Sequence, residues 1–450
     1  MSVFGVFGVQ DAAHVIYYGL HSLQHRGQEG AGIVTVDENG TFLRHRGKGL
    51  TGEVFNDSIL SGFKGTMGIG NVSYSDASHC GIDNVKPFFF RHMSGDFAIA
   101  NDGKLVNSKE LIDYLEDRGS LFQTGTDSEI LAHLIKKIGQ EPRVFMIADA
   151  LNMMEGSFSF LVITKNRIYA CRDKYGIKPL AIGKLGDGYV VSSESCAFSL
   201  VGAKFIRDVE PGEIVTIDNH GLRSVNFSRY KRNKMCAMEY IYLARPDSDI
   251  DGCNVHSYRK ESGRRLFREH PVEADIVCGV PDSSLSAAMG FSEESGIPYE
   301  MGLIKHKYVG RTFIQPVQSL RENTVKLKLS AIESIVKGKR VVLVDDSIVR
   351  GTTSLKIIKL LRDAGATEVH VRIASPRMTH PCFYGVDTTT FEELLCAHRD
   401  ADEACKFIGA DSLGFLSPEN AIKSCPGRKE LCLACFTGEY PTSLYEHEIK

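Results

Sequence analysis

Residues 341–354 read VVLVDDSIVRGTTS. The aliphatic run 341–344 predicts a buried strand, and two carboxylates, Asp345 and Asp346, follow directly at its end. A short loop of Ser, Gly and Thr residues then leads into an amphipathic helix predicted over 355–364. Ligands of open α/β sheets bind at the carboxyl ends of the strands. This stretch therefore predicts a parallel sheet and a ligand site at its edge.

The side chains of this stretch suit a phosphorylated sugar. The N–H groups of such a loop and of a helix N-terminus bind phosphate. Adjacent aspartates can accept from two ribose hydroxyls or hold a hydrated Mg²⁺. The alternative is an ordinary strand-to-helix turn in which Asp and Thr are caps. A single cap does not need two carboxylates and three hydroxyls, so we favour the phosphate and ribose site.

The pattern of predicted elements changes near residue 230. Before it, short alternating strands such as 156–161 surround helices predicted over 108–118 and 126–138, which indicates an α+β layered domain. After it, strands alternate with helices, as in an α/β domain with a parallel sheet. We predict two domains, 1–230 and 231–450, joined by a basic linker at 228–234.

Composition limits the kinds of partner. The chain has 450 residues, 43% hydrophobic and 24% charged, and its net charge is −3. Bulk charge gives no reason to expect nucleic acid or a membrane as partner. No apolar run reaches the length of a membrane span and the start lacks a basic region, so we expect a cytoplasmic protein. Its twelve cysteines are then expected to be free thiols rather than disulfides.

Further motifs identify a family. Residues 280–284, VPDSS, are similar to the pyrophosphate loop of type I phosphoribosyltransferases, and residues 305–316, KHKYVGRTFIQP, resemble their mobile lid. For the second stretch a solvated basic loop is the alternative. Together with EYIY at 239–242 and ARPDS at 244–248, these segments closely resemble the amidophosphoribosyltransferases over nearly the whole chain.

That resemblance implies an N-terminal-nucleophile (αββα) glutaminase domain followed by a type I phosphoribosyltransferase domain. It implies phosphoribosylamine synthesis from phosphoribosyl pyrophosphate in purine biosynthesis, a homo-tetramer, and inhibition by purine nucleotides. Ser283, Asp345 and Asp346 would lie around Mg²⁺. The full substrate site implied by the resemblance comprises Asp282, Ser283, Ser284, Lys305, Tyr308, Arg311, Asp345, Asp346, Ser347, Gly351, Thr352 and Thr353.

Four cysteines require a separate interpretation. Cys432 and Cys435 form a C-x-x-C pair, which alone is ambiguous between a redox pair, a metal site and coincidence. Cys236 and Cys382 fall where the cluster-containing branch of the family has cysteines. The resemblance thus implies a [4Fe–4S] cluster on these four thiolates. A Cys₄ zinc site and buried free thiols are the alternatives.

The glutaminase half departs from the family. There, a processed N-terminal cysteine directly before Gly-Val-Phe-Gly attacks the amide. Matching that motif to residues 5–8 puts Phe4 at the nucleophile position. Asp102 replaces the asparagine of the oxyanion hole, and Ser73 replaces the arginine that holds the glutamine carboxylate. Asp127, which could hold the substrate amine, is retained. Ser2, two residues upstream of Phe4, is an alternative nucleophile that we disfavour.

These departures predict a fold without glutaminase activity. The transferase would then use free ammonia or ammonia from a partner glutaminase. Two alternatives are a regulatory paralogue that binds phosphoribosyl pyrophosphate or purine nucleotides, and a transferase for another amine. Retention of the lid-like segment favours catalysis, because a sensor need not exclude water.

Overall fold

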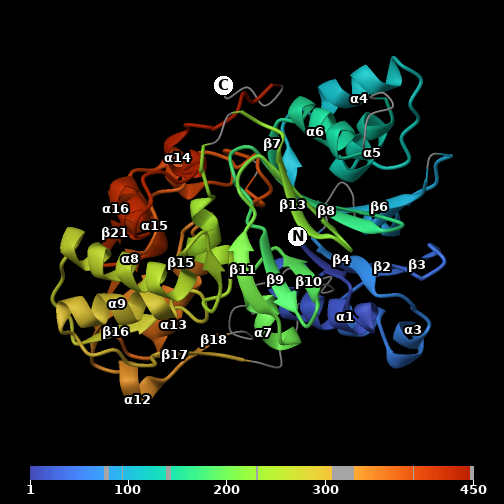
Figure 1. The fold of residues 1–450 in the computed structure, drawn as a ribbon. Helices are drawn as coiled ribbons and strands as arrows, with labels where there is room; N and C mark the ends of the chain where they lie inside the picture. Colours follow the sequence, from blue (N-terminus) through green and yellow to red (C-terminus); the bar gives the residue numbers. More distant parts are fainter. Residues whose placement is uncertain are drawn as a thin grey trace.

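The structure is a computed structural model that describes residues 1–74, 81–93, 95–137, 143–229, 232–306, 329–388 and 390–445. Two antiparallel sheets form the first half (Figure 1). One has the strand order β11-β9-β10-β1-β4-β2-β3. Its strands are β1 (Ser2–Phe7), β2 (Gly30–Val36), β3 (Phe42–Lys48), β4 (Met67–Ser73), β9 (Ala181–Leu185), β10 (Gly188–Ser192) and β11 (Lys204–Asp208).

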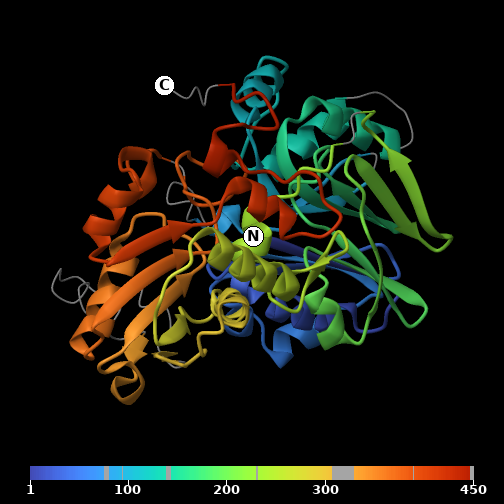
Figure 2. The same ribbon diagram turned by 90° about the vertical axis from the view of Figure 1, so that its left-hand side faces the viewer.

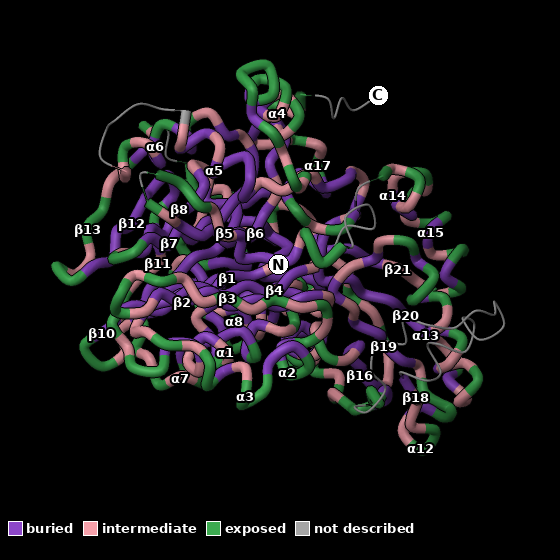
Figure 3. Tube along the Cα trace, turned by 90° about the vertical axis from the view of Figure 1, so that its right-hand side faces the viewer, coloured by how far each residue is buried: buried purple, intermediate pink, exposed green. Residues whose placement is uncertain are grey.

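The second sheet has the order β13-β12-β8-β7-β6-β5. Its strands are β5 (Phe88–Phe90), β6 (Phe97–Leu105), β7 (Gly156–Thr164), β8 (Arg167–Arg172), β12 (Glu213–Asp218) and β13 (Gly221–Asn226). An apolar core that includes Val3, Ile69 and Leu161 lies between the two sheets. The strands are accordingly the most buried part of this half (Figure 3).

Helices cover both outer faces. The first sheet packs on α1 (Ala12–Ser22), α2 (Thr51–Val54), α3 (Asp57–Ser61) and α7 (Cys196–Val201). The second sheet packs on α4 (Ser108–Glu116), α5 (Asp127–Lys137) and α6 (Arg143–Met153). Short 3₁₀ turns lie at η1 (Gln24–Arg26) and η2 (Ile82–Asn84). This αββα arrangement confirms the predicted layered domain, and α4 and α5 lie within two residues of the predicted helices.

The second half contains a parallel sheet of order β16-β19-β20-β21. Its strands are β16 (Ile276–Gly279), β19 (Arg340–Asp345), β20 (Glu368–Ile373) and β21 (Ser412–Phe415). The helices α8 (Val255–Glu269), α9 (Leu285–Ser295) and α16 (Pro418–Lys423) cover one face. The other face packs on α13 (Thr352–Asp363) and α15 (Ala401–Ile408). Val341 and Leu343 of β19 face α13, whereas Val342 and Val344 face α9, so the sheet is buried on both sides as its aliphatic run predicts.

Small elements complete this half. They are the π-helical turn η3 (Glu239–Leu243), the strand pairs β14 (Asp249–Ile250) with β15 (Cys253–Asn254) and β17 (Leu303–Lys305) with β18 (Leu329–Ala331), and the helices α12 (Glu333–Val336), α14 (Leu395–His398) and α17 (Ala434–Thr437). The red C-terminal segment lies between the orange sheet and the green strands in Figure 2. Among the described residues, no helix is long and apolar enough to cross a membrane.

Strand β1 places Phe4 on the helical side of its sheet. Side chains alternate along a strand, and Val3 and Phe7 face the second sheet while Phe4 and Val6 pack with α1. Phe4 is fully buried. A Cβ added at Gly19 of α1 would lie 2.6 Å from the Phe4 ring, so this ring fits only because residue 19 has no side chain.

We therefore expect Gly19→Ala to destabilise the protein by roughly 1–3 kcal/mol, although alanine normally favours a helix. Denaturant unfolding measures the loss. Gly52→Ala in α2 is the matched control, since its Cβ would meet only the Tyr17 hydroxyl, at 3.8 Å. Phe4→Leu should restore part of the loss in the double variant. Equal stability of the two glycine variants would contradict this placement of Phe4.

Candidate functional site

The carboxyl ends of β16 and β19 bring two predicted segments together. Because the two strands are parallel neighbours, the 280–284 loop lies beside the aspartates that follow β19. The Ser284 hydroxyl donates to Asp345 Oδ1 at 2.9 Å, and the Ser283 hydroxyl donates to Asp346. The Ser347 hydroxyl donates to Asp346 Oδ1 at 2.7 Å. Residues that sequence reasoning assigned to one site are thus in contact.

Without a cation, ionisation of both buried carboxyls, Asp345 and Asp346, is unfavourable. Burial and then the neighbouring Asp346 raise the pKa of Asp345 well above its usual range, and burial also raises the pKa of Asp346. Mg²⁺ in proteins is typically held by one or two carboxylates together with substrate phosphates and water. The donor set of two aspartates and the Ser283 hydroxyl fits such an ion. Arg259 of α8 also favours ionised Asp346; this residue was not predicted, because no motif marks it.

The loop after the aspartates has the shape expected of a phosphate cradle. Gly351 has φ +74°, and a Cβ there would lie 2.8 Å from Leu395, so glycine is needed for both conformation and space. Helix α13 starts at Thr352, and no described side chain caps its first turn. The N–H groups around Thr352 and Thr353 therefore point out of a helix N-terminus that can receive an anion. The helix begins three residues earlier than predicted.

The lid-like segment is described only at its start. Lys305, at the end of β17, donates to Asp282 Oδ2 at 2.6 Å, and both side chains are exposed. The 280–284 loop and this segment therefore touch. Tyr308 and Arg311 lie outside the described residues.

In the first half, the structure corrects the position of Phe4. Phe4 packs on α1 and does not face Asp102. Met1 is the residue beside Asp102: its backbone nitrogen lies 3.9 Å from Asp102 Oδ1 and donates to the Arg26 carbonyl at 2.7 Å. The chain begins with two Val-Phe-Gly triplets, at 3–5 and 6–8, so a motif match can shift by three residues. Because side chains alternate along a strand, a shift of the match by an odd number of residues also places each side chain on the opposite face of the sheet.

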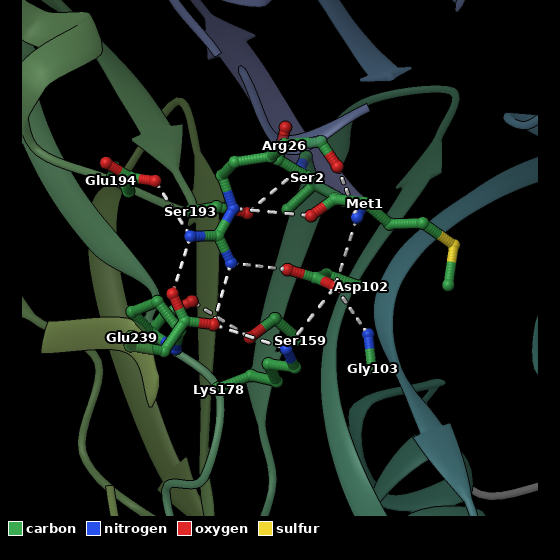
Figure 4. A network of polar contacts seen from close by, with 12 residues as sticks. Met1, Ser2, Arg26, Asp102, Gly103, Ser159, Lys178, Ser193, Glu194 and Glu239 are labelled. Atoms are coloured by element: carbon green, nitrogen blue, oxygen red, sulfur yellow. Dashed lines mark hydrogen bonds and ion pairs between the residues drawn. The ribbon is translucent and has the colours of Figure 1, made fainter. Parts of the chain in front are cut away.

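A buried charge network surrounds Asp102 (Figure 4). The Arg26 guanidinium donates to Asp102 at 3.0 Å, to Glu194 at 2.7 Å and to Glu239 at 2.6 Å. Lys178 Nζ lies 3.2 Å from Glu239 and 4.0 Å from Asp102. Each of these side chains is at most 3% exposed. Sequence reasoning missed Lys178 and Glu194 and gave no site role to Glu239 of the EYIY segment, since the partners are far apart along the chain.

The network fixes Asp102 as an anion. Burial would raise its pKa, but Lys178, the Met1 amino group and Arg26 outweigh that effect and hold the pKa of Asp102 well below its usual range. The Gly103 N–H donates to Asp102 Oδ1 at 2.7 Å. The Asp102 carboxylate therefore accepts the Gly103 N–H at the position that the resemblance assigns to the oxyanion hole.

The neighbouring positions are also changed. The Ser73 hydroxyl donates to Asn71 Oδ1 at 2.6 Å and carries no positive charge. Asp127 accepts from the Leu105 N–H at 3.1 Å, and burial raises its pKa, with Lys86 as the opposing cation. Lys86 is only 5% exposed and its Nζ lies 3.3 Å from Met1 Sδ. No sequence motif identifies Lys86.

The four predicted cysteines converge from three segments. Cys236 and Cys432 form a β-bridge, and both belong with Cys382 and Cys435 to one buried cluster. Each residue is 7% exposed. Burial, with smaller contributions from the neighbouring cysteines, raises the pKa of Cys432 and Cys435. Among the residues that the structure describes, no group of three or more His, Cys, Asp or Glu side chains is placed to hold a metal ion.

Fold and site together define a glutamine amidotransferase-type domain joined to a phosphoribosyltransferase domain. Residues 82–199 match the glutamine amidotransferase domain family, and residues 263–380 match the phosphoribosyl transferase domain family. The chain is 53% identical to the amidophosphoribosyltransferase of Bacillus subtilis (strain 168), over 99% of this chain and 95% of the relative. It is 46% identical to the amidophosphoribosyltransferase of Staphylococcus aureus (strain Mu50), over 99% of this chain and 92% of that relative.

A solved structure of a related enzyme has the same fold as this chain. The glutamine phosphoribosylpyrophosphate amidotransferase from B. subtilis, complexed with ADP and GMP, superposes with a TM-score of 0.94 at 52% identity, covering 100% of this chain and 99% of that one. The chain belongs to the amidophosphoribosyltransferase family, enzymes of purine biosynthesis.

Glu239 joins the two halves through Arg26 and Lys178, so its charge should contribute strongly to stability. We expect Glu239→Gln to destabilise the protein by roughly 3 kcal/mol, because it leaves two buried cations short of one anion. Calorimetry would show a fall in the melting temperature. Asp247→Asn, which breaks an exposed pair with Arg245, is the control and should cost less than about 1 kcal/mol. Similar melting temperatures for both variants would contradict the role assigned to the network.

Proposed function

We propose that this chain makes phosphoribosylamine from phosphoribosyl pyrophosphate and ammonia, and that its first half does not hydrolyse glutamine. The observation that carries the proposal is the ionised carboxylate of Asp102, which accepts the Gly103 N–H. The ammonia would be free or delivered by a separate glutaminase.

Repulsion between the Asp102 carboxylate and an oxyanion would slow amide hydrolysis. Amide hydrolysis by a nucleophile creates an oxyanion that needs donors, not a second anion. A carboxylate about 4 Å away costs about 4 kcal/mol at an effective dielectric constant of about 20, which corresponds to roughly a thousandfold in rate. Met1, the residue beside Asp102, has a thioether, which carries no ionisable proton and cannot act as the thiolate nucleophile.

The second half retains the groups that a phosphoribosyl transfer needs. Ser347 and the residues from Gly351 to Thr353 would hold the 5′-phosphate through backbone N–H groups and hydroxyls. Asp345 and Asp346 would accept from the ribose hydroxyls and, with Ser283, hold Mg²⁺. When bound, Mg²⁺ would neutralise charge on the departing pyrophosphate. Lys305, Tyr308 and Arg311 would supply cations and a hydroxyl to the pyrophosphate.

Membership of the family also suggests the domain boundary, the oligomeric state, the location and the inhibitors. We place the division between the glutaminase-type and transferase domains at residues 230 and 231. We also propose a homo-tetramer in the cytoplasm that purine nucleotides inhibit, since the B. subtilis structure is a complex with ADP and GMP.

Pyrophosphate release separates the nitrogen sources. With phosphoribosyl pyrophosphate and Mg²⁺, we expect turnover with ammonium and a rate with glutamine below about one hundredth of it. Asp345→Asn should abolish turnover with ammonium and with glutamine. This control shows that the measured pyrophosphate release does not come from a contaminating enzyme. Equal rates with glutamine would overturn the loss of glutaminase activity. Tight binding of phosphoribosyl pyrophosphate without turnover would instead indicate a regulatory paralogue, and turnover only with another amine would indicate a different acceptor.

We also propose that Cys236, Cys382, Cys432 and Cys435 hold a [4Fe–4S] cluster. Their burial in one group and their origin in three segments support a crosslink of the domain junction. A Cys₄ zinc site is the alternative. The cluster would be structural, with no redox step in the reaction.

Anaerobic purification tests this assignment. We expect about four iron and four inorganic sulfide atoms per chain, and loss of both in Cys432→Ser. Cys405→Ser is the control, because Cys405 lies on α15 outside the cysteine cluster and should leave the iron content unchanged. One zinc per chain, or no metal in protein handled without oxygen, would contradict the cluster.

A further inference from the structure

The loop between β19 and α13, which would hold the 5′-phosphate, is supported by residues 393–407. The Leu395 N–H donates to the Val349 carbonyl at 2.8 Å. The Arg350 guanidinium donates to Glu393 Oε1 at 2.6 Å, in an ion pair that is largely exposed. An exposed pair contributes little to stability. The backbone hydrogen bond of Leu395 is therefore the firmer of these two contacts.

The closest packing on the loop is at Gly351. A Cβ at Gly351 would lie 2.8 Å from Leu395 Cδ2 and 3.2 Å from Phe407 Cε1. Gly351 directly precedes the first turn of α13, so its φ and ψ determine where the N–H groups of Thr352 and Thr353 point. The Leu395 and Phe407 side chains thus restrict the residue that directs these donors.

The Phe407 ring is itself held in place. The Arg399 guanidinium carbon lies over the ring, 4.6 Å from its centroid. Arg377 in turn donates to the Arg399 carbonyl at 2.9 Å, and it follows strand β20 of the parallel sheet. The ring therefore has a guanidinium over its face and Gly351 at its edge, and this arrangement is tied to the sheet.

We infer that Phe407 is a positioning residue for the 5′-phosphate of the substrate, with Leu395 as the buried support beside it. Phe407 acts through Gly351 and does not itself bind the phosphate. A loop that already has its binding conformation loses less conformational freedom when the ligand binds. The role of Phe407 rests on the proposed phosphoribosyl transfer, since that function gives the loop its phosphate ligand.

Phe407→Ala removes the ring edge and leaves space beside Gly351. If the loop then has its binding conformation only about a tenth of the time, the apparent affinity for the phosphate falls about tenfold. We expect KM for phosphoribosyl pyrophosphate to rise about tenfold. We expect kcat with ammonium to change less than about twofold, because no group at the reacting atoms is altered.

Two ligands separate positioning from a general structural role. Ribose 5-phosphate would bind the loop beside Gly351, whereas Mg²⁺-pyrophosphate would bind the 280–284 loop. In calorimetry on the full-length protein, Phe407→Ala should weaken ribose 5-phosphate about tenfold and pyrophosphate less than about twofold. Phe407→Tyr keeps the ring and should bind both ligands as the wild type does.

Phe145→Ala on α6 is the matched control, since Phe145 is 48% exposed and Phe407 37%. It should leave the affinities for both ligands unchanged. Equal losses for ribose 5-phosphate and pyrophosphate in Phe407→Ala would overturn the inference. Unchanged affinity for ribose 5-phosphate in that variant would overturn it as well.

Hydrogen exchange tests the same contact without turnover. The Leu395 and Leu355 amides donate to the carbonyls of Val349 and Gly351. In unliganded Phe407→Ala, peptides with these amides should exchange faster than in the wild type, whereas β19 should exchange at the same rate. Unchanged exchange of these peptides would contradict the role of Phe407. A wild-type chain that shows this protection but makes no phosphoribosylamine would contradict the proposed function alone.

Discussion

The contact on which this structure depends is that of one buried guanidinium with three carboxylates. Arg26 binds Asp102 on β6, Glu194 after β10 and Glu239 in the second half. Each carboxylate comes from a different part of the chain, so the contact fixes the two sheets relative to each other and to the transferase half. Burial of so many charges is costly, and only mutual pairing makes it tolerable.

In the function proposed above, the same contact prevents glutamine hydrolysis by the first half. Asp102 completes the network as an anion where a glutaminase needs donors for a developing negative charge. The network thus gains an ion pair at the position where catalysis would be lost. The groups proposed for phosphoribosyl transfer lie at the ends of β16 and β19 and do not include these residues. Loss of glutamine hydrolysis is therefore compatible with retention of phosphoribosyl transfer.

The proximity of the 280–284 loop to Asp345 and Asp346 could be predicted because its determinants are local. An aliphatic strand, two aspartates and a Gly-Thr-Thr turn occupy fourteen consecutive residues, and the strand directs them all to one edge. Periodicity indicated an α+β layered domain, and the family resemblance implied its αββα arrangement. The nucleophile position was wrong because repeated Val-Phe-Gly triplets allow a shift of three residues. Partners such as Lys178 and Glu194 depend on tertiary proximity that no motif encodes.

The most direct measurement gives the enzyme both nitrogen sources at once. Glutamine labelled with ¹⁵N in the amide and unlabelled ammonium compete for phosphoribosyl pyrophosphate, and mass spectrometry reads the nitrogen in the product, trapped by derivatisation. The predicted result is phosphoribosylamine that contains only ¹⁴N, together with no glutamate above the enzyme-free level. Incorporation of ¹⁵N with matching glutamate formation would show that the Asp102 network does not prevent glutamine hydrolysis.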